Sequence, residues 1–573
     1  MNKYYYNEPS ESYDAIVVGS GISGGWAAKE LCEKGLKTLV LERGPMIEHI
    51  KDYHTAHMDP WDFPYGDEVS AEVKKRQHKQ LRFSWNIKAP HHHYFVDDID
   101  HPYNEPEGYR FDWIHGYIVG GRSLMWGRQS YRWSDFNFEA NKREGIAIDW
   151  PLRYKDLAPW YDHVEEYIGV SGENRGFDEM LPDGKFEPPM ELNIVEKKLQ
   201  EAVESTFENR YVTPGRVAHI NSDKPFEGRT RCQYRNRCIR GCPFGGYFST
   251  QASTLPAAVK TGNLTLRVDA IVSEVVYDEK TGKASGVKFI DKDSKEEEFI
   301  PAKVVFLNAS AIASAAILMN SKSERFPNGL GNDSGELGRN IMDHHLGSGA
   351  GGRIEGYTDK YYKGRRPNGF YIPRYRNLNG EQRPYKRGFG YQGGASRGNW
   401  QKLVAELAYG KELKDAILKP GEWTIGMTGF GEILPDPNNR MELDYDRLDQ
   451  WGLPTITFYT KFSDNEYQMR EDIKNDAVAM LKAMGAKDIY TYDGESQHGI
   501  GLGIHEMGTA RMGHDPKTSV TNKYNQIHAC KNVFMTDGAF MTSANCVNPS
   551  LTYMAFSARA ANYAAEQVQK GLL

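Results

Sequence analysis

Tyr13-Asp-Ala-Ile-Val-Val18 is a short strand-like run that leads directly into Gly19-Ser-Gly21-Ile-Ser-Gly24. Helical periodicity follows from Gly24 to Glu33, and Lys37 to Leu41 is extended again. Glu42 ends this second strand, 18 residues after Gly24. Strand, glycine turn, helix and acid in this register predict a βαβ unit that binds a dinucleotide.

Each glycine of the turn has a separate physical task. Gly19 permits the tight turn, Gly21 lets the backbone approach a pyrophosphate, and Gly24 lets the helix lie close to the strand. The phosphates would lie at the helix N-terminus, where free N–H groups and the helix dipole favour negative charge. Glu42 is expected to accept a hydrogen bond from the ribose. The motif alone does not separate FAD from NAD.

Length and charge narrow the class of protein. A chain of 573 residues favours two domains with a large apolar interior. The formal net charge of -6 argues against a nucleic-acid partner. The best candidate for a membrane span, Val304 to Met319, is interrupted by Asn308, Ser310 and Ser314. Direct insertion into a membrane is therefore not expected.

Strand, helix and loop signals divide the rest of the chain into segments. Glu48 to Asn104 is polar, aromatic and rich in His and Pro, which is typical of an elaborated connection. Leu346 to Tyr492 is rich in Tyr, Arg and Gly and is the expected second domain. An antiparallel meander, a buried strand and an Ala-rich helix are predicted between them. The meander consists of Ile271 to Tyr277, Ala284 to Phe289 and Glu297 to Ile300, the strand is Val304 to Leu307, and the helix is Ala309 to Met319.

Six blocks of the sequence resemble the glucose-methanol-choline (GMC) oxidoreductase family. The resemblance implies an α/β fold, with a discontinuous Rossmann-like FAD-binding domain and an α+β substrate domain that contains an antiparallel sheet. The implied FAD-binding ranges are 1–50, 105–150, 226–345 and 496–573, and the substrate-binding domain and connections are 51–104, 151–225 and 346–495. The six blocks are Tyr13–Gly44, Gly116–Asp135, Cys238–Pro256, Val304–Asn320, Gly338–His345 and Gly503–Ala565.

Within the second of these blocks, one loop would lie beside the flavin ring of the FAD that the resemblance implies. Gly120-Gly121-Arg-Ser-Leu-Met125-Trp-Gly127 resembles the family loop whose backbone amides pass beside the ring. Some sugar oxidases of the family have a histidine there that bonds covalently to the flavin, and Met125 stands at the matching position. We therefore expect non-covalent FAD.

The C-terminal part of the chain would hold the rest of the cofactor. Asp537 and Gly538 resemble the family stretch that meets the pyrophosphate and the ribityl chain. Pro549-Ser550-Leu-Thr552 should open a helix directed at the flavin carbonyl. The dipole of that helix would favour an anionic reduced flavin.

Oxidation of an alcohol requires a base, because hydride leaves the carbon easily only when the hydroxyl loses its proton. His505, in His505-Glu-Met-Gly-Thr-Ala-Arg-Met-Gly513, resembles the catalytic histidine of the family. Asn548 matches the position where members carry His or Asn. His505 can take the proton, whereas Asn548 would orient the hydroxyl by hydrogen bonding.

Three other segments contain histidines, but their sequence gives weaker evidence for a catalytic or metal-binding role. Asp343-His344-His345 follows Gly338 to Met342, which resembles a strap between the two domains, so a structural role is predicted. The run His91-His92-His93 is more typical of a polar loop than of a metal site, because three adjacent residues cannot all face one ion. His498 lies near the catalytic block, and its role is left open.

Three of the six cysteines are clustered as Cys232-x5-Cys238-x3-Cys242-Pro243. A cysteine run closed by proline favours iron–sulfur ligation over zinc, which would need a fourth ligand. The motif resembles that of bacterial sugar dehydrogenases of the GMC family, whose catalytic subunit carries a 3Fe-4S cluster, although the first spacing is one residue longer than expected. Buried thiols or a local disulfide are the alternatives.

The resemblance implies a dehydrogenase similar to the flavin subunits of glucoside 3-dehydrogenases and gluconate 2-dehydrogenases. It would oxidise a secondary hydroxyl of a sugar or glycoside, with a 3-keto-glycoside as the favoured product. Hydride would pass to flavin N5, and electrons would leave through the iron–sulfur cluster. The alternatives are an oxidase that uses oxygen, a gluconate 2-dehydrogenase-like activity, and a redox-silent flavin protein or lyase.

The expected partners are a small subunit and a cytochrome c that accepts the electrons. Such partners imply work in the periplasm. The chain begins Met-Asn-Lys-Tyr-Tyr-Tyr-Asn-Glu and lacks the features of a secretory signal. We therefore expect export with a small subunit that carries the signal, and a cytoplasmic location is the alternative.

Overall fold

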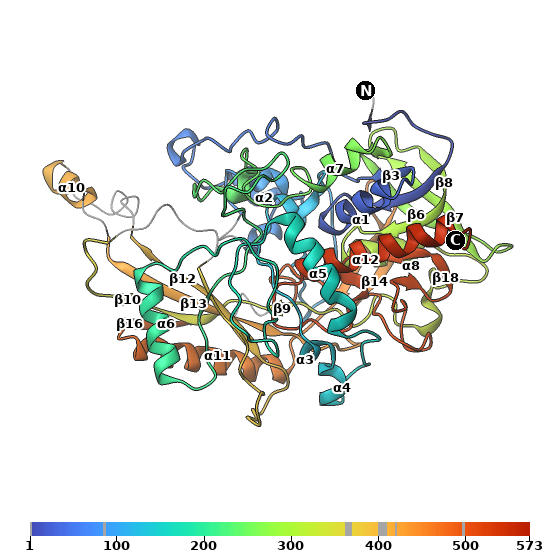
Figure 1. Cartoon of the computed structure of the whole chain (residues 1–573). Helices are drawn as coiled ribbons and strands as arrows, with labels where there is room; N and C mark the ends of the chain where they lie inside the picture. Colours follow the sequence, from blue (N-terminus) through green and yellow to red (C-terminus); the bar gives the residue numbers. More distant parts are fainter. Residues whose placement is uncertain (1–2, 84–86, 361–368, 399–409, 419–420, 495–498) are drawn as a thin grey trace.

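The computed structural model describes residues 3–83, 87–360, 369–398, 410–418, 421–494 and 499–573. Two β-sheets lie side by side and form the cores of its two parts (Figure 1). The part that contains both chain termini is built on a nine-stranded mixed sheet, and the other on a seven-stranded antiparallel sheet. The predicted fold class, a Rossmann-like α/β domain joined to a domain with an antiparallel sheet, is confirmed.

Five adjacent strands of the nine-stranded sheet, in the order β5-β3-β2-β8-β18, run parallel to their neighbours. Such strands are covered on both faces, which explains continuous apolar runs such as Ile16-Val17-Val18. The strands are β1 (Tyr4–Tyr5), β2 (Tyr13–Val18), β3 (Thr38–Leu41), β5 (Leu264–Arg267), β6 (Ala270–Asp278), β7 (Lys283–Asp291), β8 (Glu297–Leu307), β17 (Gln526–Ile527) and β18 (Cys530–Met535).

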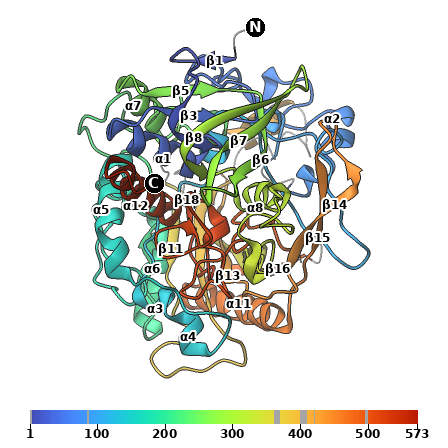
Figure 2. The ribbon, with the colours of Figure 1, turned by 90° about the vertical axis from the view of Figure 1, so that its right-hand side faces the viewer.

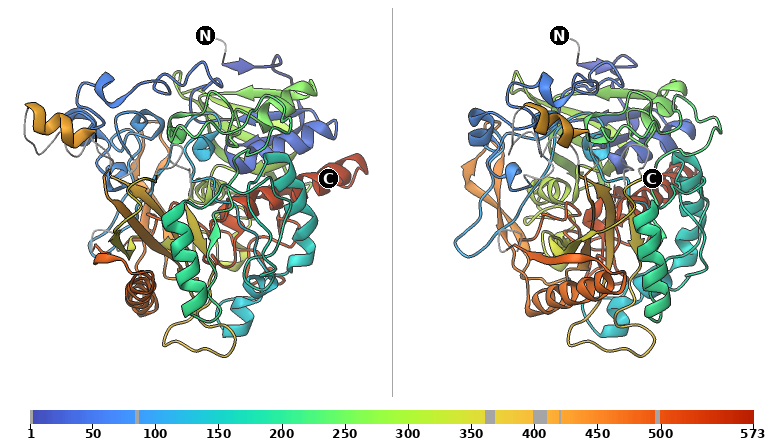
Figure 3. Two further views of the ribbon diagram at one scale, coloured as in Figure 1. Left: turned by 60° about the vertical axis from the view of Figure 1, so that its left-hand side comes forward. Right: turned by 90° about the vertical axis from the view of Figure 1, so that its left-hand side faces the viewer.

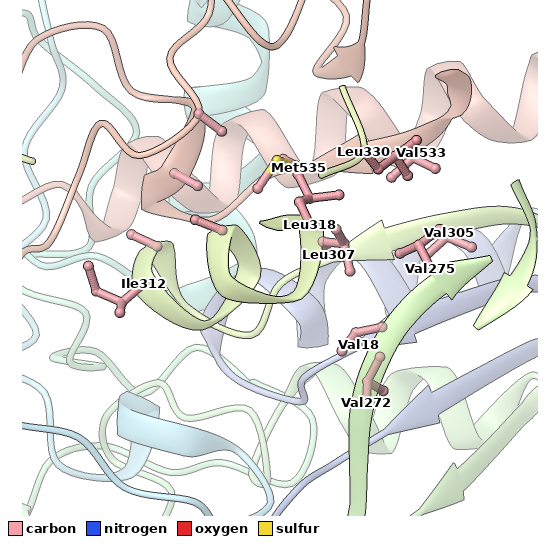
Figure 4. Packing of buried hydrophobic residues seen from close by; sticks show 14 of the residues in the cluster. Val18, Val272, Val275, Val305, Leu307, Ile312, Leu318, Leu330, Val533 and Met535 are labelled. Atoms are coloured by element: carbon pink, nitrogen blue, oxygen red, sulfur yellow. The ribbon is translucent and has the colours of Figure 1, made fainter. Parts of the chain in front are cut away.

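Alternate residues of these strands face two different layers. Ala15 and Val17 of β2 face helices α1 (Ile22–Glu33) and α12 (Ser550–Gln569) on one side. Ile16 and Val18 face α8 (Ala311–Asn320) and the β6–β7 hairpin on the other. Figure 4 shows this second layer, and Figure 2 shows the sheet with its helices from the side. Helices α5 (Tyr154–Ile168) and α7 (Thr254–Lys260) cover α12 and α1 in turn.

Strand β8 differs from the sequence-based expectation. The pattern predicted two strands, Glu297 to Ile300 and Val304 to Leu307, but the structure joins them into one that includes Pro301. Its first half pairs antiparallel with β7, and its second half pairs parallel with β2. Pro301 lies where the strand passes from one partner to the other, so the proline does not end it.

The antiparallel sheet forms the other part of the molecule. Helices α6 (Ile194–Thr206) and α11 (Asp464–Ala483) pack on one of its faces (Figure 3). The opposite face contributes Gln392 and Phe430 to the cavity described below. Its strands are β4 (Thr213–Pro214), β9 (His344–His345), β10 (Ser348–Ile354), β11 (Phe370–Ile372), β12 (Phe389–Arg397), β13 (Trp423–Glu432) and β16 (Lys487–Asp493).

The remaining segments connect or extend these two parts. Strands β14 (Arg440–Leu448) and β15 (Pro454–Tyr459) form a separate hairpin. All nine strands of the mixed sheet come from 1–50, 226–345 and 496–573, whereas β9 of the antiparallel sheet also falls in 226–345. The exact domain boundaries stay a prediction.

Short helices in the connections include α2 (Ala71–Arg76), α3 (Asp135–Phe138), α4 (Ala140–Glu144) and α10 (Gly410–Ile417). Within the described residues, every helix is too short or too polar to span a bilayer.

We predict that Gly24→Ala destabilises the fold. A Cβ at Gly24 would lie 1.9 Å from the carbonyl oxygen of Gly19, so α1 would have to move away from the strand. The free energy of unfolding of the cofactor-free protein should fall by about 3 kcal/mol, as measured by urea denaturation. The matched control is Gly21→Ala, whose Cβ would meet no atom within 4 Å and should leave that stability unchanged. Equal stability of the two variants would refute this packing argument.

Candidate functional site

A cavity of about 570 Å³ is bordered by both parts of the molecule. The strand-to-helix turns of the nine-stranded sheet contribute Gly19, Gly21 and Ser310. The antiparallel sheet and the β14–β15 hairpin close it from the other side. Further lining residues include Glu42, Gly121, Met125, Gln392, Phe430, His505, Asp537, Gly538, Asn548 and Ser550, so segments far apart in the sequence meet here.

Three helices begin at this cavity, namely α1, α8 and α12. Their first turns contain no acidic residue, and no side chain caps their N-termini. Their free N–H groups and positive dipole ends are therefore available to an anionic ligand such as a pyrophosphate.

The glycines of the first turn give the cavity its shape. Gly19 has φ +92°, and a Cβ there would lie 2.5 Å from the carbonyl oxygen of Asn308. A Cβ on Gly21 would meet no protein atom within 4 Å, because this residue borders the cavity. Gly24 lies behind the turn and does not line the cavity. The open space at Gly21 fits a ligand that approaches the backbone closely.

Six residues that line the cavity have a buried polar atom without a partner among the described residues. The atoms are Nδ2 of Asn308, Nε1 of Trp113, Nε2 of His115, Nδ1 of His101, and Nε of Arg43 and of Arg128. Nδ1 of His115 lies 2.8 Å from the carbonyl oxygen of Trp113 and donates to it, so Nε2 is an acceptor. Donors and an acceptor that need partners fit a polar ligand such as FAD, which offers both kinds of group.

Glu42 is held rigidly at the end of β3. Its carboxylate accepts hydrogen bonds from the backbone and hydroxyl of Ser20, at 3.0 and 2.5 Å, and from the backbone N–H of Gly44 at 2.9 Å. It also lines the cavity. This carboxylate is an acceptor suited to a ribose hydroxyl.

The loop from Gly120 to Gly127 passes beside the same turn. The backbone N–H of Gly120 donates to the hydroxyl of Ser20 at 2.8 Å. Gly120 has φ +84°, and a Cβ there would clash with Gln251 at 2.3 Å. Gly120 itself packs away from the cavity, whereas Gly121 and Met125 line it.

The C-terminal residues predicted to bind FAD separate into two groups. Asp537, Gly538 and Ser550 line the cavity, and burial raises the pKa of Asp537 to about 6. Thr552 does not line it, because its hydroxyl bonds to that of Tyr161 at 2.9 Å inside the core. The helix opened by Pro549 does begin at the cavity.

His505 and Asn548 lie together at the cavity wall. Nε2 of His505 is 3.4 Å from Nδ2 of Asn548. Burial lowers the pKa of His505 far below its usual value, and the nearby ring of His344 and the positive charge of Arg122 lower it further. The imidazole is therefore neutral at ordinary pH and can accept a proton.

Two residues of this site were not found by reading the sequence. Nδ1 of His344 lies 2.9 Å from Nδ1 of His505, although a structural role was predicted for this segment. Gln392 donates from Nε2 to Oδ1 of Asn548 at 2.5 Å. The only sequence signal was the position of His344 in a block that resembles the family. His498 lies outside the described residues.

Asp343 fixes the backbone around the two histidines. Its carboxylate accepts hydrogen bonds from four backbone N–H groups, those of His344, Gly501, Gly503 and His505, at 2.7 to 3.0 Å. In the described part of the chain, Asp343, His344 and His505 are the one group close enough to share a metal ion. Their atoms already bond to the backbone and to each other, so the arrangement favours a hydrogen-bond network.

The three clustered cysteines line a second, smaller cavity. Cys232, Cys238 and Cys242 are free thiols, so the local disulfide is absent. Burial raises the pKa of Cys232 to about 11. The sulfur of Cys238 lies 3.8 Å from Nε2 of His219. The next residue, Ile239, lines the large cavity, so the cysteine loop separates the two spaces.

Comparison with known proteins agrees with this architecture. Models of the GMC oxidoreductase family match residues 13–346 and 435–557. The large subunit of fructose dehydrogenase from Gluconobacter japonicus is 27% identical over 588 residues, which covers 98% of this chain and 99% of that protein. The gluconate 2-dehydrogenase flavoprotein of Pantoea cypripedii is 24% identical over a match that covers 94% of this chain and 91% of that protein.

A solved structure shows the same fold. The crystal structure of pyridoxine 4-oxidase from Mesorbium loti matches with a TM-score of 0.57 at 15% identity, and covers 96% of this chain and 98% of that one. The family matches confirm the resemblance seen in the sequence. The chain therefore belongs to the GMC oxidoreductase family and is an FAD-dependent oxidoreductase.

Proposed function

We propose that this protein is a dehydrogenase that oxidises a secondary hydroxyl of a sugar or glycoside to a keto-sugar. The observation that carries the proposal is the pair formed by Nε2 of His505 and Nδ2 of Asn548, which places an acceptor and a donor together at the cavity wall. The names of two full-length relatives, a fructose dehydrogenase subunit and a gluconate 2-dehydrogenase flavoprotein, support a sugar or sugar acid as substrate.

The residues of the pair have complementary tasks. Bound FAD would supply the acceptor for the hydride, and the glycine turns and helix N-termini around the cavity would hold it. Nε2 of His505 accepts the hydroxyl proton, because its imidazole is neutral. Nδ2 of Asn548 donates a hydrogen bond to the substrate oxygen, where negative charge develops as the proton leaves. Together they orient one carbinol group.

The antiparallel sheet supplies a wall suited to a sugar. Phe430 lies with its ring centroid 6.5 Å from that of His505, and both side chains line the cavity. An aromatic ring beside the base can pack against the apolar face of a pyranose. Among secondary hydroxyls, we propose the C3 hydroxyl of a glycoside as the first candidate, on the basis of the family resemblance alone.

We propose further that Cys232, Cys238 and Cys242 hold a 3Fe-4S cluster. They line one cavity, but their three sulfur atoms do not all lie within 4.8 Å of one another. This spread fits a multi-iron cluster better than one ion. Iron would displace the thiol protons, including those of Cys232 and Cys238, whose pKa burial raises. The cluster would transfer single electrons outward. Ile239, which follows Cys238 in the cysteine loop, borders the FAD cavity.

The surface beside the cysteine loop has features that favour binding of a protein partner. Trp61, Tyr65 and Phe244 expose 67%, 65% and 38% of their surface. Arg237 in the loop pairs with Asp59, which joins the two segments that carry these rings. Aromatic side chains and arginine are enriched in protein interfaces. We propose that a small subunit and a cytochrome c bind here, with the assembled enzyme in the periplasm.

We predict that His505→Gln abolishes most of the activity but retains the cofactor. Loss of the base should slow anaerobic bleaching of the flavin by sugar roughly 10²- to 10⁴-fold, with the flavin absorbance unchanged. Stopped-flow spectroscopy over fructose, gluconate and methyl glucosides measures this, and His528→Gln, away from the cavity, is the control.

Other outcomes of that screen decide between the functions. A His505→Gln rate within threefold of the wild-type rate would remove the residue from the mechanism. Bleaching of the wild type that is reversed by air with release of hydrogen peroxide would favour an oxidase. A wild-type flavin that no alcohol bleaches would favour a redox-silent role.

The rate of flavin reduction should stay constant to an unusually low pH. Protonation of His505 abolishes its function as a base, so the rate falls only as the pH drops through a pKa far below the ordinary 6.5. In single-turnover measurements we expect no loss of the base between about pH 8 and about pH 6, and any smaller change near pH 7 would come from Asp343, whose pKa burial raises to about 7. A tenfold fall per pH unit that begins near the ordinary histidine pKa would contradict this.

Cys238→Ser should separate substrate oxidation from electron export. Iron and acid-labile sulfide should be lost, and cytochrome c reduction should fall at least tenfold. Anaerobic bleaching of the flavin by sugar should continue, because the FAD cavity is intact. Cys32→Ala, whose thiol lies in α1 outside the cysteine loop, should keep both the iron and the cytochrome activity. An iron-free wild type with full cytochrome activity would exclude the cluster.

A further inference from the structure

A continuous chain of hydrogen bonds runs through the catalytic pair. At one end, Nε2 of Gln392 donates to Oδ1 of Asn548, whose Nδ2 lies 3.4 Å from Nε2 of His505. Nδ1 of His505 lies 2.9 Å from Nδ1 of His344. At the other end, Nε2 of His344 lies 2.8 Å from the backbone carbonyl oxygen of Asn545.

The carbonyl of Asn545 fixes the direction of the whole chain. A carbonyl oxygen can only accept, so Nε2 of His344 must carry a hydrogen. A neutral imidazole with its hydrogen on Nε2 has a lone pair on Nδ1, and burial lowers the pKa of His344 to about 4, which keeps it neutral. Nδ1 of His505 must then carry the hydrogen of the bond between the two rings.

We propose that His344 is a positioning residue that fixes the proton of His505 on Nδ1, so that Nε2 keeps its lone pair as an acceptor at the cavity wall. This inference rests on the proposed role of His505 as the base. In the opposite tautomer, two lone pairs would face each other at 2.9 Å and the hydrogen bond would be lost. That tautomer would also present an N–H to the substrate hydroxyl, and such a nitrogen cannot accept its proton.

The anchor of the chain is itself held in place. Asn545 has φ +59°, a left-handed conformation that asparagine tolerates better than most residues. Its side-chain oxygen accepts hydrogen bonds from Nδ2 of Asn137 at 2.9 Å and from the backbone N–H of Cys546 at 2.6 Å. His344 is held on its backbone by pairing with Glu432 of β13. The carbonyl and the ring therefore meet in one fixed geometry.

The other end of the chain supports the same direction. Because Gln392 donates to Oδ1 of Asn548, the amide of Asn548 presents its N–H groups to the cavity. A reversed amide would place its oxygen opposite the Nε2 lone pair of His505, which neither atom could satisfy. The two ends together give the pair one acceptor and one donor.

The direct test is the position of the proton on His505. In ¹⁵N-histidine-labelled holoenzyme without substrate, we expect a protonated Nδ1 and an unprotonated Nε2, with the resonances assigned by their loss in His505→Gln. A wild-type His505 protonated on Nε2 would overturn the proposal. Because no substrate is present, this result stands apart from the proposed function, which fails separately if no sugar bleaches the flavin.

Variants of His344 test its role through a second readout. His344→Leu removes the acceptor, so we expect protonation of Nε2 of His505 to increase and kcat for whichever alcohol bleaches the flavin to fall about tenfold or more, with KM little changed. His344→Asn restores an acceptor oxygen and should recover most of both signals. An Asn variant no better than the Leu variant would refute the role.

The neighbouring His345 provides the matched control. It is equally buried, lies on the same short strand and contacts the sulfur of Met469 instead of the site. His345→Leu should leave the proton of His505 on Nδ1 even if it lowers stability. If this variant shifted the proton as His344→Leu does, the effect would be general disturbance of the strand, and the proposal would be wrong.

Discussion

The buried carboxylate of Asp343 joins the two backbone segments on which the site depends. Burial raises the pKa of this carboxyl to about 7, and the hydrogen bonds from four backbone N–H groups act in the opposite direction by stabilising its charged form. Gly503 must be glycine, because a Cβ would lie 2.4 Å from the same carboxylate. Since the N–H groups of both His344 and His505 bind this carboxylate, their rings are brought within bonding distance.

Features that depend on neighbouring residues could be predicted from the sequence. The glycine turn, the βαβ unit and the helix after Pro549 each result from a few adjacent residues, and the structure contains all three. Strand β8 was divided wrongly. A proline is rare inside a strand, but Pro301 lies where the pairing partner of β8 changes from β7 to β2. The sequence showed that three cysteines lie close together along the chain, but not that Ile239 between them would border the large cavity.

Features that depend on distant contacts could not be predicted. His344 and His505 are 161 residues apart, and Gln392 and Asn548 are 156 residues apart. His344 and His345 look equivalent in the sequence, yet alternate residues of a strand face opposite sides. Only the pairing of β9 with β13 decides that His344 faces the site and His345 faces Met469 of α11.

The two parts of the molecule contribute differently to the catalytic pair, and this limits how specificity can change. The tautomer of the base His505 is fixed by His344, which follows the segment Gly338 to Met342, and by Asn545 in the C-terminal part of the chain. The donor is oriented from the antiparallel sheet, through Gln392 of β12. The same sheet forms the wall that would contact a sugar. Substitutions there that admit a new substrate therefore also disturb the amide of Asn548 unless Gln392 is kept, whereas Phe430 can vary without breaking the hydrogen-bond chain.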